Sequence, residues 1–197
     1  MQIDKVCLKK IDFLPFQLRL DELFILMDKK YKGAADYYVF NCKGCKDNCC
    51  LTRFYHHTLL EYIYIQKGFD TLDKEQQIEA KKRADASVGL MFEAEKNNTP
   101  FRVMCPLNID GMCMLYDYRP MICRLHGIPH ELYTYHKGII KSPGCDTFIK
   151  KTKVKGYYKF DRTPFYTGLA ELEKDIRVLS GIKSRVKMTI AQMLRNF

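Results

Sequence analysis

The sequence has no apolar run of the roughly 18 residues that a membrane-spanning helix needs. Residues 1–7 include an acidic residue and lack a continuous apolar stretch, so they do not resemble a secretory signal peptide. No internal repeat or low-complexity stretch is visible, and an apolar content of 47% excludes disorder as the main state. We therefore expect a single folded domain, residues 1–197, located in the cytoplasm.

The usual signatures of several catalytic and binding classes are also missing. There is no recognisable Ser/His/Asp arrangement and no glycine-rich nucleotide loop of the usual kind. No RNA-binding motif or zinc-finger spacing is present, so nucleic acid is not the favoured partner. These absences leave no residue assignable to catalysis, and both an enzyme and a non-catalytic protein stay open.

Cysteine is the residue type that stands out, with nine in 197 residues. A cytoplasmic chain keeps its thiols reduced, and an odd total leaves one unpaired, so a disulfide framework explains them poorly. Four of them lie within nine residues among lysines and polar residues, which does not fit small buried core side chains. Cys7 stands alone near the N-terminus and is left out. We predict that the other eight are metal ligands: Cys42, Cys45, Cys49, Cys50, Cys105, Cys113, Cys123 and Cys145.

The first four of these ligands form a dense cluster. Cys42-Lys43-Gly44-Cys45 is a Cys-x-x-Cys unit, whose two sulfurs can approach one zinc or iron ion from a tight turn. Cys49 and Cys50 are adjacent, which hinders one small tetrahedral ion from using both. Different centres, or different corners of a larger cluster, accommodate such a pair more easily. One metal centre and two metal centres both stay open.

The remaining four cysteines are spread over the second half of the chain. Cys105 and Cys113 are expected on the two arms of a hairpin within residues 102–116, where they could face each other if the register allows. Cys123 is expected on a short helix and Cys145 in a turn. Only the fold could bring this discontinuous set together.

The periodicity predicts a mainly helical α+β domain. A small cysteine-rich β-hairpin metal-binding core, residues 40–146, would be enclosed by N- and C-terminal helices, the latter within residues 160–197. Gly33 is expected to end the first helix, Thr58 to cap the second and Ser180-Gly181 to break the last. The expected elements are helices over about 17–30, 59–67, 74–96, 119–125 and 164–196, and a second hairpin at 132–140.

The combined cysteine pattern resembles the YkgJ-like cysteine-cluster family. The resemblance rests on Cys42-x-x-Cys45-x-x-x-Cys49-Cys50, on Cys105-Pro106-Leu107 and Gly111-Met112-Cys113, and on Arg119-Pro120-Met121-Ile122-Cys123-Arg124. That family is described as zinc- or iron-chelating. A larger and more distant relative of the family, the flagellin lysine methylase, is described as using an iron–sulfur cluster with S-adenosylmethionine. The chain is short for that activity, and its cysteine order runs opposite to the Cys-x-x-x-Cys-x-x-Cys order of radical S-adenosylmethionine enzymes.

The resemblance implies a bound metal, and all-thiolate sites suit iron–sulfur clusters and zinc alike. We expect an iron–sulfur cluster, most simply 4Fe-4S, in a protein serving electron transfer or S-adenosylmethionine-linked methyl transfer. The alternative is a structural zinc-binding interaction module without catalytic activity. Arg119 and Arg124 are expected to compensate thiolate charge beside Cys123, and His126 to act as a ligand or as a hydrogen-bond donor to one. Of His56 and His57, one is expected in the core and one at the surface.

The net charge of +10 is concentrated in the last third of the chain. Residues 1–136 hold 19 basic and 18 acidic residues, whereas residues 137–197 hold 14 basic and 5 acidic residues. The excess begins at Lys150-Lys151-Thr152-Lys153-Val154-Lys155, with Lys159 just beyond. A solvated face that offsets thiolate–metal charge and a docking surface for an anionic protein or small-molecule partner are the two interpretations.

Overall fold

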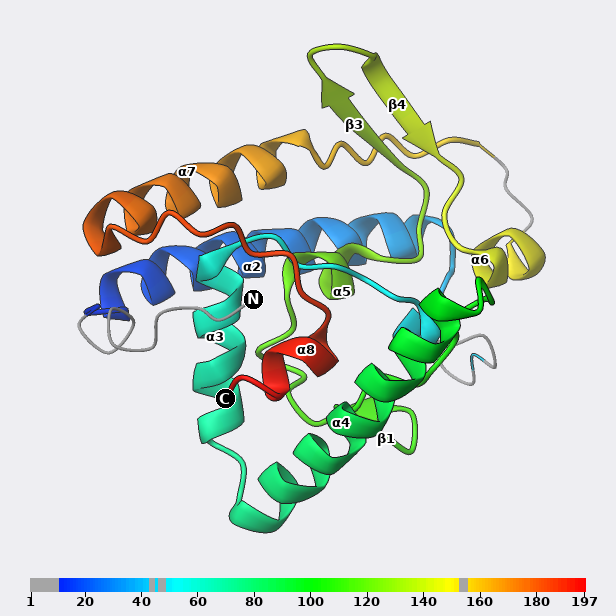
Figure 1. Cartoon of the computed structure of the whole chain (residues 1–197). Coiled ribbons are helices and arrows are strands. Elements are labelled where there is room, and N and C mark those ends of the chain that lie inside the picture. Colours follow the sequence, from blue (N-terminus) through cyan, green and yellow to red (C-terminus); the bar gives the residue numbers. More distant parts are fainter. Residues whose placement is uncertain (1–10, 43–44, 46–48, 153–155) are drawn as a thin grey trace. The chain divides into compact units, whose positions relative to one another are not determined.

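The computed structural model describes residues 11–42, 45, 49–152 and 156–197. It is a mainly helical α+β structure with two small antiparallel hairpins, so the predicted fold class is confirmed (Figure 1). The chain divides into two compact units, which are described separately here. Among the described residues, unit 1 consists mainly of Cys50–Pro120 and Ile176–Phe197, and unit 2 of Asp12–Cys49 and Met121–Asp175. None of the helices in the described part of the chain is long and apolar enough to cross a membrane.

Unit 1 is built on helices whose N-terminal caps were predictable from the sequence. The Thr58 side chain accepts a 3.1 Å hydrogen bond from the Glu61 amide, as its Thr-x-x-Glu pattern predicts. Asp73 caps the next helix and forms a full capping box with Gln76. The elements of unit 1 are α3 (Leu59–Asp70), α4 (Lys74–Lys96), β1 (Asn108–Ile109), β2 (Met112–Cys113) and α8 (Ile190–Leu194). A 3-10 turn, Cys49–Leu51, spans the boundary between the units.

The core of unit 1 lies under α3, α4 and α8. Helix α4 presents a buried stripe of small and medium side chains and packs against α8. The C-terminal Phe197 ring lies between two aromatic rings of α3, 5.2 Å from Tyr62 and 5.5 Å from Phe69. Gly68 continues α3 because its lack of a side chain admits the Tyr118 ring, whose Cγ would stand 2.4 Å from an added Cβ. These ring contacts hold the half-buried Phe197 against α3.

The first hairpin is shorter than predicted. Its register pairs Asn108 with Cys113 and Ile109 with Met112 around a turn in which Asp110 and Gly111 both have positive φ. Cys105 lies before β1, so the expectation that it faces Cys113 across the hairpin is wrong. A turn takes up the intervening residues, with the Asn108 amide donating to the Cys105 carbonyl at 2.9 Å.

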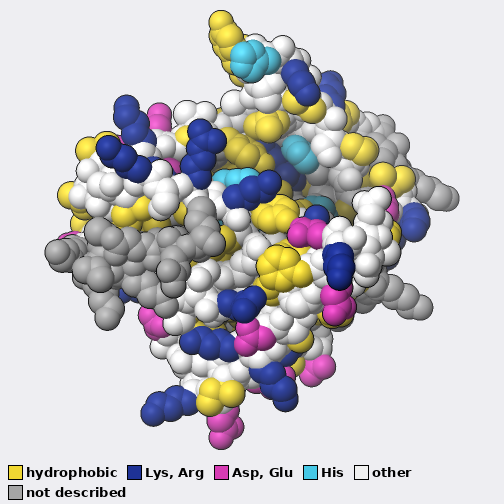
Figure 2. All heavy atoms as spheres, viewed as in Figure 1, with side chains coloured by type: hydrophobic (Ala, Val, Ile, Leu, Met, Phe, Trp, Pro, Cys, Tyr) yellow, Lys and Arg dark blue, Asp and Glu magenta, His cyan; other side chains and the backbone are white. Residues whose placement is uncertain are grey.

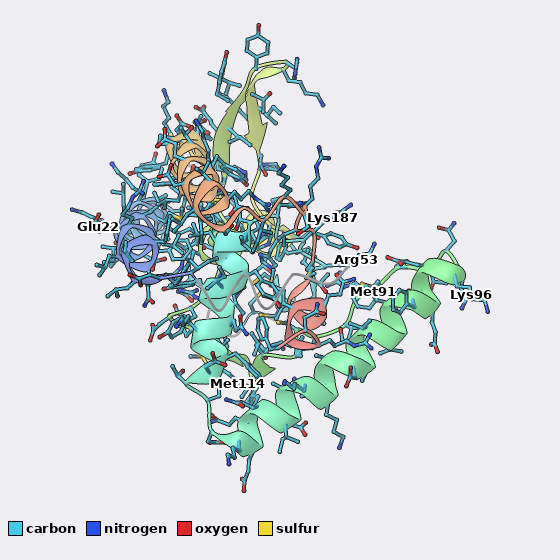
Figure 3. All side chains as sticks on the ribbon, turned by 60° about the vertical axis from the view of Figure 1, so that its left-hand side comes forward. Glu22, Arg53, Met91, Lys96, Met114 and Lys187 are labelled. Carbon is cyan, nitrogen blue, oxygen red and sulfur yellow. The ribbon has the colours of Figure 1, made fainter. Side chains whose placement is uncertain are left out.

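Unit 2 is built on two long helices and one hairpin. Helices α2 (Leu14–Tyr37) and α7 (Thr163–Ser180) lie side by side in Figures 1 and 3, and Arg19 of α2 pairs with Asp175 of α7 at 2.9 Å. The last residues of α7, Ile176–Ser180, belong to unit 1. The other elements are α5 (Met121–Leu125), β3 (His130–Thr134), β4 (Gly138–Ser142) and α6 (Asp146–Lys151).

Several helix ends differ from the prediction. Gly33 does not end α2, which runs four residues further, to Tyr37, and α3 continues past its expected end at residue 67 to Asp70. A Cβ at Gly33 would make an ordinary van der Waals contact with the Tyr158 hydroxyl, at 3.5 Å, so this position does not require a glycine. The predicted break at Ser180-Gly181 is confirmed, with Gly181 at φ 68°. The chain then runs without helix until α8, so the expected long helix to residue 196 is reduced to Ile190–Leu194.

The second hairpin, β3–β4, agrees with the prediction. Its ladder runs from His130 opposite Ser142 to Thr134 opposite Gly138, and Gly138 has the positive φ that the turn requires. On its other edge, β3 exchanges backbone hydrogen bonds with the residues leading into α7: the Glu131 amide donates to Phe160 and the Arg162 amide donates to Glu131. This pairing ties the hairpin to α7 within unit 2.

Candidate metal centre

The eight predicted ligands are all described and are all free thiols. They fall into two sets, because the boundary between the compact units lies between the adjacent residues Cys49 and Cys50. Unit 1 contains Cys50, Cys105 and Cys113, and unit 2 contains Cys42, Cys45, Cys49, Cys123 and Cys145. Cys7 lies outside the described residues.

Backbone hydrogen bonds hold the three cysteine segments of unit 1 together. The Cys105 amide donates to the Cys50 carbonyl at 2.9 Å, which joins the 3-10 turn to the segment before β1. Cys113 is held in β2 by its pairing with Asn108, and the Met114 amide donates to the Leu107 carbonyl at 2.8 Å. A short turn therefore carries the chain from Cys105 back beside Cys113, and all three thiols are half-buried.

The three thiols of unit 1 act on one another electrostatically. The pKa of Cys105 is raised to about 12, mainly by burial and to a lesser degree by the thiols of Cys50 and Cys113, against a backbone hydrogen bond at Leu107. The pKa of Cys113 is raised by the same causes, burial first and then Cys50. Thiols that disfavour each other's ionisation in this way form a donor set that a soft cation would stabilise.

Two arginines of unit 1 bring positive charge to these thiols. Arg83, on α4, lowers the pKa of Cys105, and its guanidinium donates a 2.5 Å hydrogen bond to the Asn108 carbonyl. Arg119 lowers the pKa of Cys113; it donates to the Tyr116 carbonyl at 2.8 Å and stacks on that ring at 3.6 Å. The expected partner of Arg119 was Cys123, whereas the thiol it acts on in unit 1 is Cys113. The position of Arg83 beside these thiols could not be predicted from the sequence, because it is one of several charged residues on a polar helix.

In unit 2 Cys45 is held both to Cys42 and to the start of α6. The Cys45 amide donates to the Cys42 carbonyl at 3.1 Å, and the Cys45 thiol is 3.2 Å from the Thr147 hydroxyl. Cys145 caps α6, its sulfur accepting from the Phe148 amide at 3.3 Å, and its own amide donates to Gly127 at 2.9 Å. This brings together cysteines from the two ends of the predicted core.

Glycine makes that approach sterically feasible. Gly144 has φ 91°, and a Cβ there would stand 2.7 Å from the Gly127 carbonyl oxygen. The turn that delivers Cys145 can therefore lie directly against the segment after α5 only because residue 144 has no side chain.

Tyr31 is the principal site residue that the sequence analysis missed. From α2, its hydroxyl donates a 3.0 Å hydrogen bond to the His126 carbonyl. Burial raises its pKa, and the thiols of Cys42, Cys145 and Cys49 raise it further. Three of the five cysteines of unit 2 thus act electrostatically on Tyr31. Nothing in its local sequence distinguishes it from a packing tyrosine.

The pKa of Cys42 is shifted by several groups of unit 2. Burial raises it, followed by the thiols of Cys145 and Cys45, whereas a hydrogen bond from Tyr31 and the charge of Lys151 lower it. Cys42 is nevertheless exposed, unlike any of the three thiols of unit 1. Cys123 lies on α5 of the same unit and is half-buried.

The structure also places the flanking arginine and histidines, and ligation by His126 stays a prediction. Arg124 is buried, pairs with Asp28 at 2.6 Å and lies over the Phe24 ring at 4.3 Å, so it ties α5 to α2. Burial and Arg162 lower the pKa of His126, which favours its neutral form. The expected division of the histidine pair is confirmed, with His56 buried and His57 exposed.

Positive charge also gathers outside the two thiol sets. In unit 1, Arg53 lies over the Tyr55 and Phe101 rings at 5.6 Å and pairs with Glu95 at 2.8 Å, while Lys187 lies over Tyr55 at 5.0 Å (Figure 3). In unit 2, Lys150 and Lys151 form the last turn of α6, and residues 153–155 lie outside the described part. On the face drawn in Figure 2, basic side chains are interspersed with acidic and apolar ones.

The donor chemistry of both sets fits a soft metal ion or an iron–sulfur cluster, since every predicted ligand is a thiol. Across the described residues, no three His, Cys, Asp or Glu side chains stand in an arrangement ready to hold a metal ion. Ligation would therefore require the thiols of each set to turn toward a common point. That all eight cysteines are ligands stays a prediction.

Comparison of the chain with protein-family models, curated proteins and solved structures finds no match. The resemblance to the cysteine-cluster family therefore rests on the spacing of the cysteines and of the Arg-Pro-x-x-Cys-Arg segment alone.

Proposed function

We propose that the protein is a cytoplasmic cysteine-cluster metalloprotein that binds an iron–sulfur cluster. The metal ligands, in one centre or two, would be Cys42, Cys45, Cys49, Cys50, Cys105, Cys113, Cys123 and Cys145. The protein would serve electron transfer or S-adenosylmethionine-linked methyl transfer. The observation that carries the proposal is that cysteine segments distant in sequence are tied together: the Cys105 amide bonds the Cys50 carbonyl, and the Cys45 thiol lies 3.2 Å from the Thr147 hydroxyl, two residues beyond Cys145. Bringing several thiols together raises the free energy of their ionised forms, unless a bound cation compensates the negative charge.

The choice of iron–sulfur over zinc rests on charge and on the adjacent cysteine pair. Cys49 and Cys50 are difficult to place together on one tetrahedral zinc ion. Hydrogen bonds to cluster sulfurs tune reduction potentials, and Tyr31 and Thr147 are hydroxyls within reach of thiols in unit 2. A zinc-stabilised interaction module without chemistry of its own is the second candidate, favoured by the same all-thiol donor set.

Basic residues near the thiols support docking of an anionic protein or small molecule. Lys151 ends the short helix that Cys145 caps, and its charge lowers the pKa of the Cys42 thiol, which supports a basic surface beside that set. Lys187 provides a further exposed cation of the last third, in unit 1. If these residues steer a partner, raising the salt concentration should weaken its binding, whereas salt-independent binding would remove the steering role.

Replacing single ligands tests the proposal. We expect Cys45→Ser and Cys123→Ser to lose bound metal and much of the protein's solubility, because each substitution removes a thiolate from the centre. Iron, acid-labile sulfide and zinc would be measured per chain after anaerobic purification.

Cys7→Ser is the matched control, since Cys7 is not among the predicted ligands, and it should keep the metal content of the unchanged protein. Full metal content in both Cys45→Ser and Cys123→Ser would contradict the ligand assignment.

A further inference from the structure

We infer that the chain holds two separate metal centres, one in each compact unit, and that the adjacent residues Cys49 and Cys50 serve different centres. This inference rests on the proposed function, which leaves the number of centres open. Cys50, Cys105 and Cys113 would belong to the centre of unit 1. Cys42, Cys45, Cys49 and Cys145 would belong to the centre of unit 2, with Cys123 of α5 in the same unit.

Backbone hydrogen bonds between the cysteine-bearing segments support this division into two centres. In unit 1 the Cys50 carbonyl accepts from the Cys105 amide, and a single turn links Cys105 to the strand that carries Cys113. The short reach of a cysteine side chain makes segments tied in this way natural co-ligands. These contacts involve only residues of unit 1.

The cysteine segments of the second set are likewise held together by contacts within unit 2. The Cys45 thiol contacts Thr147, two residues beyond Cys145, and the Cys145 amide is bonded to Gly127 just after α5. Cys49 lies in the same compact unit as these residues, whereas Cys50, the next residue, lies in unit 1. We therefore assign Cys49 to the second set.

The charged residues and the solvent exposure around the two thiol sets differ, which is consistent with two distinct centres. Each set has its own positive charges: Arg83 bonds the carbonyl of Asn108, which pairs with Cys113 in unit 1, and Lys151 ends the short helix that Cys145 caps in unit 2. Each also differs in access, because Cys42 is exposed whereas all three thiols of unit 1 are half-buried. We therefore expect the centre of unit 2 to release its metal first.

Native mass spectrometry of the full chain, purified anaerobically, counts the centres. The unchanged protein should carry two metal centres, Cys105→Ser only that of unit 2, and Cys145→Ser only that of unit 1. The double variant should carry none, and Cys7→Ser should carry both. Circular dichroism would confirm that each variant keeps its helices.

Stepwise removal of metal from the unchanged protein by a chelator gives a readout that does not depend on any variant folding. An intermediate that retains one complete centre is expected. A single centre in the unchanged protein, or loss of all metal in either folded single variant, would overturn the partition and leave the proposed function standing. Loss of all metal in one step on chelation would overturn it too. A protein that binds no metal after iron-supplied anaerobic expression would overturn the proposed function and the partition with it.

Discussion

The Cys105 amide donates a 2.9 Å hydrogen bond to the Cys50 carbonyl, joining two cysteine-bearing segments that are far apart in the sequence. The bond fixes the backbone of both segments while leaving each thiol able to turn about its side-chain torsion. A preformed backbone with adjustable sulfurs is suited to a site that is completed only when metal arrives. Burial and the neighbouring thiols, which raise the pKa of Cys105, keep that thiol protonated at neutral pH until a cation displaces the proton.

Tyr31→Phe should weaken metal binding in unit 2 without unfolding the protein. The substitution removes the hydroxyl, which donates to the His126 carbonyl and lowers the pKa of the Cys42 thiol, but keeps the ring that packs on Phe160. Removing such a supporting hydrogen bond typically costs about tenfold or more in metal affinity. Competition with a chelator of known affinity measures the effect, and Tyr37→Phe, an exposed tyrosine of the same helix, is the matched control. Equal affinity in both variants would show that Tyr31 is only a packing residue.

Gly68→Ala should destabilise the protein although alanine is the better helix former. An added Cβ would stand 2.4 Å from Cγ of the Tyr118 ring, so the ring must move, at a cost of about 1–3 kcal/mol in the free energy of unfolding. Gly89→Ala is the control in α4, where nothing lies within 4 Å of the new Cβ. There the substitution should stabilise by about 0.5–1 kcal/mol. Denaturant unfolding of both variants measures the difference, and a stabilising Gly68→Ala would contradict the close packing of Tyr118 on α3.

His56 should make the stability of unit 1 depend on pH between about 6.5 and 4. Burial, and to a lesser degree His57, lowers the pKa of His56 from 6.5 to about 4. The unfolded chain therefore takes up the proton first, and the stability contributed by neutral His56 is lost as pH falls below 6.5. At pH 5 the loss is about 2 kcal/mol.

The measurement is the gap in unfolding free energy between the unchanged protein and His56→Leu, at pH 7 and at pH 5. Taking the difference cancels the protonation of thiolates, which both proteins share. The gap should move by about 2 kcal/mol in favour of the variant at the lower pH. A gap that stays constant would mean that His56 is already charged in the folded state.

Local signals in the sequence were sufficient for much of the fold. The caps at Thr58 and Asp73 specify the starts of α3 and α4, and Gly138 specifies the turn of the β3–β4 hairpin. Where the prediction was wrong, the local signal did not decide the outcome. Gly33 lies inside α2, and Cys105 is held by Cys50 rather than by a partner strand.

The candidate site was predictable in its residue types but not in its grouping. Cysteine spacing suggested metal ligation, and the adjacency of Cys49 and Cys50 raised the option of two centres. The boundary between the compact units at this pair depends on contacts of the folded chain that no local pattern encodes. Tyr31 and Arg83 could not be identified for the same reason, because each reaches a thiol from a helix remote in sequence.

The central claim is that this chain carries an iron–sulfur cluster, and the absorption spectrum of anaerobically purified protein before and after dithionite tests it most directly. The account predicts brown protein with a broad visible band that bleaches on reduction, together with iron and acid-labile sulfide in equal amounts. Zinc has no accessible redox state and gives no such band. Colourless protein with stoichiometric zinc after iron-supplied, strictly anaerobic expression would contradict the claim and leave the structural zinc module in its place.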